Sequence, residues 1–342
     1  QNINIYFCLD KYFELNSDNK SNLKLAETIF KCLDNYPRTF IPGELVNQRL
    51  ELLKRLSSSQ LLEKQYQQSK NSCEKALEII ASVDNLEENK AIFYDCLGKV
   101  ASKFRNFEEA RYNFQLALDI KIKYGDCSSA ASTYHWLGIL ELECREFEEA
   151  RRNYKQALEI WIVENNRYNQ NYSYHELGRV EEELGEFEKA RSNYQQALKI
   201  LMEEDNVSYE QAGVYLHLGI VAYKLRNFEE ARCNYEQALG VFVEYKDSSN
   251  QGTTYHQLGT LSEELGEYEQ ARGYYQQALL ITIEDKDRYF LALTYYCLGT
   301  LAEKQKDYAE ARMNLQKALE IYVEYKEEYW GNIARENLER LP

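Results

Sequence analysis

The 342-residue chain contains little that interrupts a helix. It has only three prolines, Pro37, Pro42 and Pro342, and only 15 glycines. No segment is rich in glycine and serine, so no linker marks a boundary between separate domains. We therefore expect one elongated domain that is almost entirely helical after residue 42. No apolar run approaches the roughly 18 residues of a membrane span, and we predict no membrane partner.

Basic residues are also in deficit, with 41 Lys and Arg against 56 Asp and Glu. The net charge is −15 and the isoelectric point is near 5.0. A protein that binds nucleic acid through its phosphates needs a basic face, so this balance argues against a nucleic-acid partner, including the RNA that some helical-repeat proteins bind. A neutral or basic protein partner fits the charge better.

The cysteines lack the spacing of a metal or disulfide framework. No C-x-x-C pair is present, and the eight residues are scattered irregularly: Cys8, Cys32, Cys73, Cys96, Cys127, Cys144, Cys233 and Cys297. This pattern is typical of reduced thiols in a cytoplasmic protein. The first residues resemble no secretory signal, and because they include no initiator methionine we expect the chain to be a piece of a longer polypeptide.

Motifs that carry catalysis are missing as well. The chain has no G-x-x-x-x-G-K-[ST] loop, no G-x-S-x-G turn, no EF-hand loop and no Cys/His pair at catalytic spacing. We therefore predict no catalytic residue, no metal and no cofactor, and the sequence disfavours an enzyme.

The sequence does contain an internal repeat. A Leu-Gly pair recurs six times, at intervals of 40, 40, 41, 40 and 40 residues. An aromatic residue precedes each glycine by four places, and an Ala-Arg pair begins twelve places after it. A fixed period of this length predicts a stack of small identical units without a single central core. The six glycines are Gly98, Gly138, Gly178, Gly219, Gly259 and Gly299.

Each copy reads as two helices joined by a short turn. In residues 174–200 the second helix carries Phe187, Ala190, Tyr194 and Ala197, at steps of three and four residues that place them on one stripe. The repeat glycine lowers helix propensity by about 1 kcal/mol, so we expect it to allow a close approach of the second helix. Glycine also occupies the turn at Gly185 and Gly266, whereas other copies have Arg or Lys there, which indicates a less well specified turn.

Glutamates lie in the first turn of the second helices, for example Glu108 and Glu148, and arginine follows three residues later. Acidic residues at this position complement the helix dipole and can pair with Arg111 and Arg151. Because the motif recurs with the architecture, we interpret it as structural.

The periodicity also sets the expected boundaries. Residues 1–41 form an N-terminal helical cap, in which residues 22–36 have helical spacing. A degenerate copy precedes the six regular ones, and residues 326–342 match the first helix of a further copy, as a capping half-repeat. The array covers residues 42–325, with copies at about 42–82, 83–122, 123–162, 163–203, 204–243, 244–283 and 284–325.

The pattern aromatic-x-x-Leu-Gly, then Ala-x-x-x-aromatic, then Ala-Leu, resembles the tetratricopeptide repeat (TPR). The forty-residue form is similar to repeats of kinesin light chain, of Leu-Gly-Asn-repeat adaptors and of cyanobacterial arrays attached to STAND-type (NB-ARC or NACHT) nucleotide-binding modules. The resemblance covers about residues 43–341 and implies an all-α, right-handed superhelical α-solenoid of helix–turn–helix repeats. The chain departs from the common TPR in its longer period, its lack of a repeat-ending proline and its tyrosine in place of tryptophan.

The resemblance further implies that the first helices line a concave groove, into which the residues at −6, −3, +1, +4 and +5 from the repeat glycine point. Carried onto this chain, these positions predict a partner-binding groove that contains Lys99, Lys103, His135, Ile139, His175, Arg179, Glu182, Tyr223, His256, Glu263 and Tyr296. Lys99 and Lys103 are followed by Ile139 and Leu142 in the next copy, so the family's peptide-carboxylate clamp is not predicted.

Three of the four histidines, His135, His175 and His256, occupy the same repeat position, and His217 misses it by one. They could donate hydrogen bonds to a peptide, make the groove sensitive to pH, or simply descend from one duplicated repeat. A shared metal is disfavoured, because equivalent positions on helices about 8–10 Å apart cannot meet around one ion.

Taken with the resemblance, these features favour a non-catalytic scaffold that binds a protein or peptide in its groove. A more specific alternative makes the chain the ligand-sensing C-terminal arm of a larger STAND-type signalling ATPase, whose nucleotide-binding module lies in the same parent polypeptide.

Overall fold

A computed structural model describes residues 19–34, 43–83, 85–203, 209–285 and 287–342. The sequence-based expectations for residues 1–18 and 35–42 lie outside these ranges. No strand occurs within the described ranges, and one 3-10 turn, η2 (Glu87–Asn89), interrupts the helices. The α-helices are α2 (Asn19–Asp34), α3 (Gly43–Leu62), α4 (Tyr66–Ala81), α5 (Lys90–Lys103), α6 (Phe107–Tyr124), α7 (Cys127–Glu143), α8 (Phe147–Val163), α9 (Arg167–Glu183), α10 (Phe187–Met202), α11 (Tyr209–Lys224), α12 (Phe228–Glu244), α13 (Ser248–Glu264), α14 (Tyr268–Asp285), α15 (Arg288–Lys304), α16 (Tyr308–Glu324) and α17 (Glu328–Arg340).

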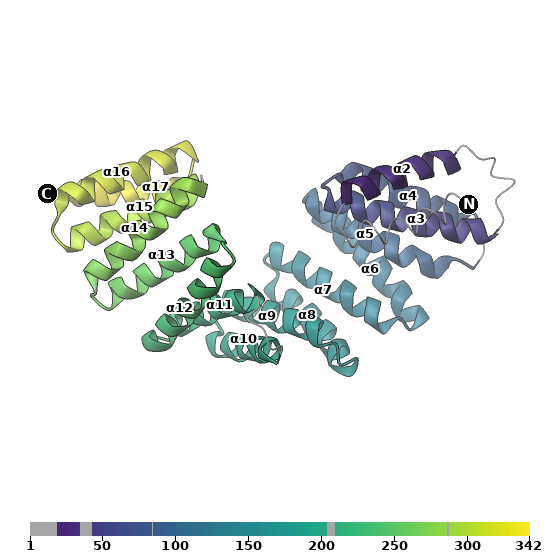
Figure 1. Cartoon of the computed structure of the whole chain (residues 1–342), viewed down its shortest axis with the longest axis horizontal. Coiled ribbons are helices and arrows are strands. Elements are labelled where there is room, and N and C mark those ends of the chain that lie inside the picture. Colours follow the sequence, from purple (N-terminus) through teal and green to yellow (C-terminus); the bar gives the residue numbers. More distant parts are fainter. Residues whose placement is uncertain (1–18, 35–42, 84, 204–208, 286) are drawn as a thin grey trace. The chain divides into compact units, whose positions relative to one another are not determined.

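The chain divides into two compact units, Gln1–Ser173 and Tyr174–Pro342, and the division falls inside α9. Each unit is a succession of antiparallel helix pairs, in which a first helix packs on the second helix of the same repeat and then on the next pair (Figure 1). The predicted all-α repeat fold is confirmed. In the part of the chain that the structure describes, no helix is both long and apolar enough to span a membrane.

The requirement for glycine at the repeat position has a direct steric cause. A Cβ atom added to Gly138 or Gly178 would lie 2.6 Å from the ring of Tyr154 or Tyr194, sixteen residues later on the second helix. Real side chains essentially never approach so closely, because carbon atoms in contact lie about 3.5–4.0 Å apart. Both rings are fully buried, as is the alanine four residues before each of them. The expected close approach is confirmed, and its partner is the core ring of the same repeat.

The turn inside each repeat adopts one conformation in all six regular copies. The residue seven places after the repeat glycine is left-handed in each, whether it is glycine or not: Arg105, Arg145, Gly185, Arg226, Gly266 and Lys306. The expectation of a less well specified turn at the basic residues was therefore wrong. A left-handed non-glycine residue costs about 1–2 kcal/mol. A cation–π contact offsets part of this cost at the three arginines, each of which lies 5.5–5.7 Å from the ring of the phenylalanine two residues later.

Arginines link successive repeats. Arg111 pairs with Glu108 of its own helix at 2.8 Å, as the sequence predicts, but it also pairs with the buried Glu141 of the next repeat at 2.7 Å. The equivalent Arg191 reaches Glu230 of the following repeat at 2.8 Å. The arginine of the Ala-Arg pair therefore joins neighbouring repeats as well as pairing with a glutamate of its own helix.

The two ends of the described chain are closed by single helices. Helix α2 buries Leu23, Ala26 and Phe30 in a cluster with residues of α3 such as Leu53. At the other end, α17 buries Ala334 in a cluster with Tyr322 of α16. These helices cover apolar faces that a terminal repeat would otherwise expose.

Candidate functional site

The predicted groove residues lie on the first helices, which are α5 and α7 in the N-terminal unit and α9, from Tyr174 on, α11, α13 and α15 in the C-terminal unit. Within each unit, we call the surface of these helices its first-helix face. At the −3 position, the rings of His135, His175 and His256 lie 5.4–5.6 Å from the core tyrosine nineteen residues later. Each histidine therefore packs on the ring that also covers its own repeat glycine. This contact gives the recurring histidine a structural role in every repeat where it occurs.

His256 is the most enclosed of the predicted residues, with 8% of its side chain exposed. Phe290 of the next repeat covers it from the other side, with ring centroids 5.4 Å apart. Burial lowers the pKa of His256 to about 4. The residue is therefore neutral at pH 7, and it contributes little to the surface that a partner would meet.

His175 belongs to a cluster that the repeat register does not anticipate. Its ring lies 5.3 Å from His217 of α11, and His217 stacks on Tyr194 at 5.2 Å with nearly parallel planes. The same Glu182 oxygen accepts a hydrogen bond from the Tyr194 hydroxyl at 3.0 Å and lies 3.2 Å from Nδ1 of His217. Two histidines, a tyrosine and a carboxylate therefore form one network across two neighbouring repeats. We call these four residues the His175–His217 cluster.

Arg179 completes the edge of this cluster. It is exposed and donates a hydrogen bond to Glu176 at 2.9 Å, while Nδ1 of His175 lies 3.3 Å from the other oxygen of Glu176. Arg179 thus places an exposed cation beside the partly exposed histidine rings of the cluster, and Glu176 and Glu182 are engaged by these neighbours. Burial, together with the charge of Glu182, raises the pKa of the Tyr194 hydroxyl, so this group acts as a donor.

A similar arrangement recurs two repeats later. Glu263 accepts a hydrogen bond from the hydroxyl of Tyr275 at 2.8 Å and pairs with Lys304 at 2.8 Å. The bond to Glu263 raises the pKa of Lys304. In both repeats the carboxylate at the +4 position, Glu182 or Glu263, therefore accepts a hydrogen bond from the hydroxyl of the core tyrosine.

The repeat between these two breaks the pattern. Its +4 residue is Tyr223, so no carboxylate faces the core Tyr235, whose hydroxyl has no hydrogen-bond partner among the described residues. Tyr223 is half-buried, and burial and the charge of Glu264 raise its pKa. This repeat therefore offers an aromatic surface where its neighbours offer charge.

The first-helix face of the N-terminal unit has different chemistry. The Lys99 ammonium lies 4.5 Å from the ring centre of Trp136, and burial lowers the pKa of Lys99. Beneath it, the buried Lys121 pairs with Asp95 and donates to the Thr133 hydroxyl at 2.6 Å. Thr133 in turn donates to Asp95 at 2.9 Å, which satisfies the groups of this buried pair.

The remaining predicted residues are placed as follows. Lys103 is exposed in the last turn of α5, and Ile139 is half-buried on α7. Tyr296 packs its ring 5.7 Å from Trp330 of α17 and accepts a hydrogen bond from Asn337 at 3.0 Å, so it anchors the last helix. The predicted set thus includes exposed residues, half-buried residues and residues engaged in packing.

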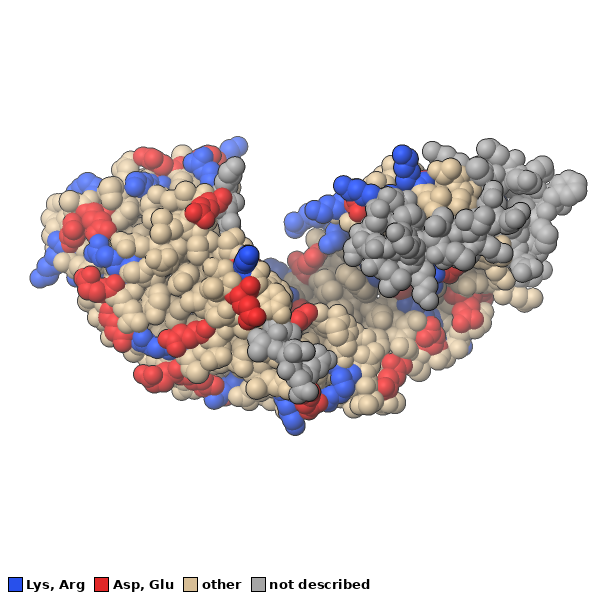
Figure 2. Space-filling model, viewed as in Figure 1, with Lys and Arg blue, Asp and Glu red and all other residues tan. Residues whose placement is uncertain are grey.

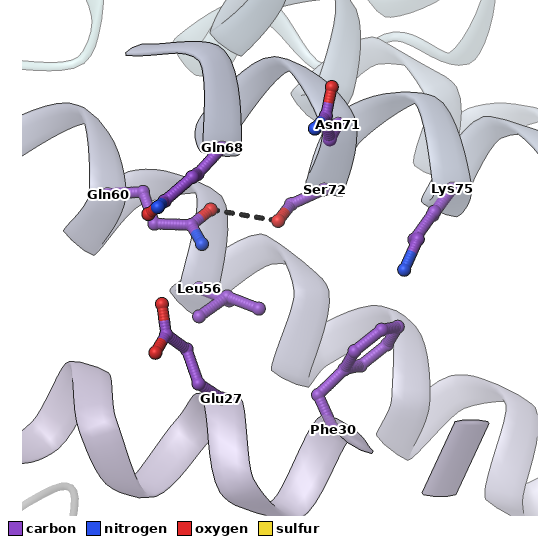
Figure 3. Close-up of a pocket in the computed structure, with 8 residues that line it drawn as sticks. All are labelled: Glu27, Phe30, Leu56, Gln60, Gln68, Asn71, Ser72 and Lys75. Atoms are coloured by element: carbon purple, nitrogen blue, oxygen red, sulfur yellow. Dashed lines mark hydrogen bonds between the residues drawn. The ribbon is translucent and has the colours of Figure 1, made fainter. Parts of the chain in front are cut away.

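No feature of the sequence predicts a polar cavity that lies near the N-terminal end. It has a volume of about 310 Å³ and lies between α2, α3 and α4. Figure 3 shows Glu27 and Lys75 on opposite sides of it, with Gln60 accepting a hydrogen bond from Ser72 at 2.8 Å on the wall. Its size is at the lower end for small-molecule sites. Across the described residues, no three His, Cys, Asp or Glu side chains are grouped to hold a metal ion.

These features define a class of protein: a helical-repeat protein whose core positions are constant and whose first-helix face varies from repeat to repeat. Sequence profiles described as tetratricopeptide repeat match residues 129–203 and 210–282, and another profile with that description matches residues 291–325. The chain belongs to the tetratricopeptide repeat family. No curated protein matches its sequence.

Solved structures share the fold at low sequence identity. The apo form of RapI matches 99% of this chain and 96% of its own, at 15% identity and a TM-score of 0.72. A STAND protein with a tetratricopeptide repeat sensor, PH0952 from Pyrococcus horikoshii, matches 92% of this chain with 50% of its own, at 18% identity and a TM-score of 0.71. A putative kinesin light chain from Podosopora anserina matches 58% of this chain and 97% of its own, at 17% identity and a TM-score of 0.51.

Proposed function

We propose that this chain is a non-catalytic scaffold that binds a protein or peptide on its first-helix face. The His175–His217 cluster carries the proposal. Together with the adjacent Arg179, it combines exposed or half-exposed cationic and aromatic groups with the carboxylates of Glu176 and Glu182, which are already held by hydrogen bonds. Groups that are held in place before binding lose less conformational entropy when a partner arrives.

The contrast between constant and variable positions supports the same proposal. The core residue, which is aromatic in five regular repeats and Leu315 in the sixth, is buried together with its flanking alanines. The +4 position, by comparison, holds Glu182, Tyr223 and Glu263 in three consecutive repeats. Variation at exposed positions of one face is expected where that face recognises an extended partner residue by residue.

Structural neighbours are consistent with a peptide partner. A Rap protein complexed with Competence and Sporulation Factor matches 99% of this chain at 16% identity and a TM-score of 0.56. That similarity concerns the fold, and a peptide-like partner for this chain is part of the proposal. We further propose a cytoplasmic location and a neutral or basic partner, on the basis of the thiols and the net charge of −15.

A peptide-display selection tests the proposal. Peptides selected on the wild-type chain would be measured again on a face variant, His175→Ala, Arg179→Ala and Tyr223→Ala. The matched control replaces three exposed glutamines of second helices, Gln196→Ala, Gln237→Ala and Gln277→Ala. We expect at least about tenfold weaker binding to the face variant, because few residues carry most binding energy, and little change in the control. Equal binding to the face variant and the wild type would contradict the assignment.

A second candidate function is the sensor arm of a STAND-type signalling ATPase. The match of 92% of this chain to half of a STAND protein with a repeat sensor favours it. The complete reading frame from which the chain derives would test it. A phosphate-binding G-x-x-x-x-G-K-[ST] loop in that frame supports the candidate, and a frame without one removes it.

A further inference from the structure

An exposed aliphatic residue recurs at one position of every regular repeat. Twenty-four places after the repeat glycine, in the last turn of each second helix, stand Ile122, Ile162, Met202, Val243, Ile283 and Val323. Their exposed fractions are all between 50% and 61%. Single exposed apolar residues are ordinary on protein surfaces, but recurrence at one position in six repeats is not expected of a solvated helix end.

Most of the burial at this helix end falls on the preceding residue. The preceding position, twenty-three places after the glycine, is buried in all six copies and anchors the end of the second helix: Lys121, Trp161, Leu201, Phe242, Thr282 and Tyr322. The identity of this anchor varies widely, whereas the exposed neighbour is always aliphatic. Burial at this helix end therefore falls mainly on the anchor, and about half of the surface of the neighbouring aliphatic residue stays open to a partner.

In the C-terminal unit, tyrosines extend these apolar positions. Tyr209 lies 5.7 Å from Tyr245, and Tyr289 lies 6.2 Å from Tyr325, measured between ring centres. All four are between 39% and 50% exposed. They stand at the start of first helices and the end of second helices, and so at the same ends of the helix pairs as the aliphatic residues. We call Met202, Val243, Ile283 and Val323 with these tyrosines the apolar edge.

Charge distinguishes this edge from the N-terminal unit. Residues 1–173 contain 23 basic and 25 acidic residues, a net charge of −2, whereas residues 174–342 contain 18 and 31, a net charge of −13. A glutamate directly follows each aliphatic residue of the edge: Glu203, Glu244, Glu284 and Glu324. Lys246, Lys326 and Arg288 lie nearby, and Arg288 pairs with Glu324 at 2.7 Å, so carboxylates remain in excess.

Figure 2 shows red carboxylate and blue basic side chains interspersed with tan areas on the visible face of the C-terminal unit. Apolar groups that alternate with carboxylates match a partner surface in which apolar groups alternate with lysine or arginine.

We propose that the apolar edge of the C-terminal unit is a second docking surface, and that its occupant is a basic amphipathic helix of another protein. Helices pack about 8–10 Å apart, so equivalent residues of successive repeats are separated by roughly 16–20 Å. At a rise of 1.5 Å per residue, a helix of about 20 residues spans two such positions. The surface lies at the helix ends and is separate from the first-helix face.

Fluorescence anisotropy with defined probes tests the proposal. The probe is a labelled helical peptide of about 22 residues, with leucine at helical spacing on one face and lysine on the other. A second peptide replaces its lysines by glutamate, and a third replaces its leucines by serine. The edge variant is Met202→Gln, Val243→Gln, Ile283→Gln and Val323→Gln. Its control is Gln196→Ala, Gln237→Ala, Gln277→Ala and Gln316→Ala, at exposed sites on the same four helices.

We expect the lysine–leucine peptide to bind the wild type and the control equally and the edge variant at least about tenfold more weakly. The other two peptides should bind weakly to all three proteins. Unchanged binding to the edge variant would overturn the proposal. So would loss of binding in the face variant alone, which would place the peptide on the first-helix face instead.

Two further outcomes concern the occupant. Equal binding of the glutamate–leucine peptide would refute a basic partner. Concentration-dependent self-association of the wild type in sedimentation velocity, absent from the edge variant, would assign the edge to a second copy of this chain and overturn the choice of a separate partner.

Discussion

The contact between repeat glycine and core ring predicts opposite effects for two glycines of one repeat. Gly219 lies in α11 against Tyr235, and a Cβ atom there would lie 2.5 Å from two ring carbons. Gly240 lies in α12 and is exposed, and a Cβ atom there would meet nothing within 4 Å. Replacement of each by alanine adds the same atom to a helix in two different surroundings.

The two magnitudes follow from separate effects. Alanine is favoured over glycine in a helix by about 1 kcal/mol, so Gly240→Ala should stabilise the protein by about that amount. At Gly219 the added carbon must displace a fully buried ring by about 1 Å. Overpacking of this kind costs about 3 kcal/mol. The net effect of Gly219→Ala is therefore a loss of about 2 kcal/mol, and the two variants should differ by about 3 kcal/mol.

Urea titration followed by far-ultraviolet circular dichroism measures both free energies of unfolding. Because repeat arrays can unfold in stages, hydrogen exchange at amides of α11 and α12 provides a local measurement of the same quantity. In a Tyr235→Ala background the ring is absent, and Gly219→Ala should then cost less than in the wild type.

One result would refute the reasoning. If Gly219→Ala were as stable as Gly240→Ala, the ring of Tyr235 would not restrict this position, and the recurrence of the Leu-Gly pair would need another cause. Equal costs of Gly219→Ala in both backgrounds would lead to the same conclusion.

Three further predictions follow from buried groups. Tyr194→Phe should lower the free energy of unfolding by about 1.5–3 kcal/mol, because it removes a hydrogen bond to the charged Glu182. The hydroxyl of Tyr235 has no hydrogen-bond partner among the described residues, so Tyr235→Phe should be neutral or stabilising by up to about 1 kcal/mol. Thermal melts compare the two variants, and equal losses of stability would contradict the assignment. Burial lowers the pKa of His256 to about 4, so between pH 6.5 and 4 the imidazole is protonated in the unfolded chain but not in the folded chain. The free energy of unfolding should therefore fall by about 3 kcal/mol as the pH decreases from about 6.5 to 4. Urea titrations at several pH values should show a smaller decrease for His256→Leu, which introduces the residue found at the equivalent Leu216. Lys121→Met should lower the free energy of unfolding by about 3–5 kcal/mol, because it leaves Asp95 without its buried partner. In the same denaturation assay, addition of Asp95→Leu should recover most of that loss. A double variant no more stable than Lys121→Met would show that the loss of stability does not come from breaking this pair.

The periodicity of the sequence is sufficient to predict the fold, because the repeats solve the same packing problem with nearly the same residues. The glycine and the flanking alanines recur in register in the six regular copies, and the core aromatic recurs in five of them, with Leu315 in its place in the last. Each is buried where the register places it. The turn shows the limit of this reasoning. Glycine at Gly185 indicates a left-handed residue, but Arg145 adopts the same conformation with a neighbouring aromatic ring as compensation. That compensation depends on a contact two residues away that no propensity scale includes.

The surface is less predictable because exposure depends on the neighbouring repeat. His175 and His256 share a repeat position, yet Phe290 of the next helix covers His256 and leaves it 8% exposed. His217 illustrates the opposite case. It misses the histidine register by one residue, and its ring nonetheless meets His175, since offset positions on adjacent helices can converge where equivalent positions cannot. Whether the predicted groove residues contact a partner remains a proposal for the binding experiments.

The link between glycine and core ring has a kinetic consequence. The two residues are sixteen positions apart, so the central contact of each repeat closes a short loop. Loops of about 10 residues close in about 10–100 ns, and domains dominated by such local contacts fold rapidly. Any repeat can therefore serve as the nucleus, with structure growing outward one helix pair at a time. A nascent chain emerging from the ribosome could begin to order its first helix pairs well before its last residues are made.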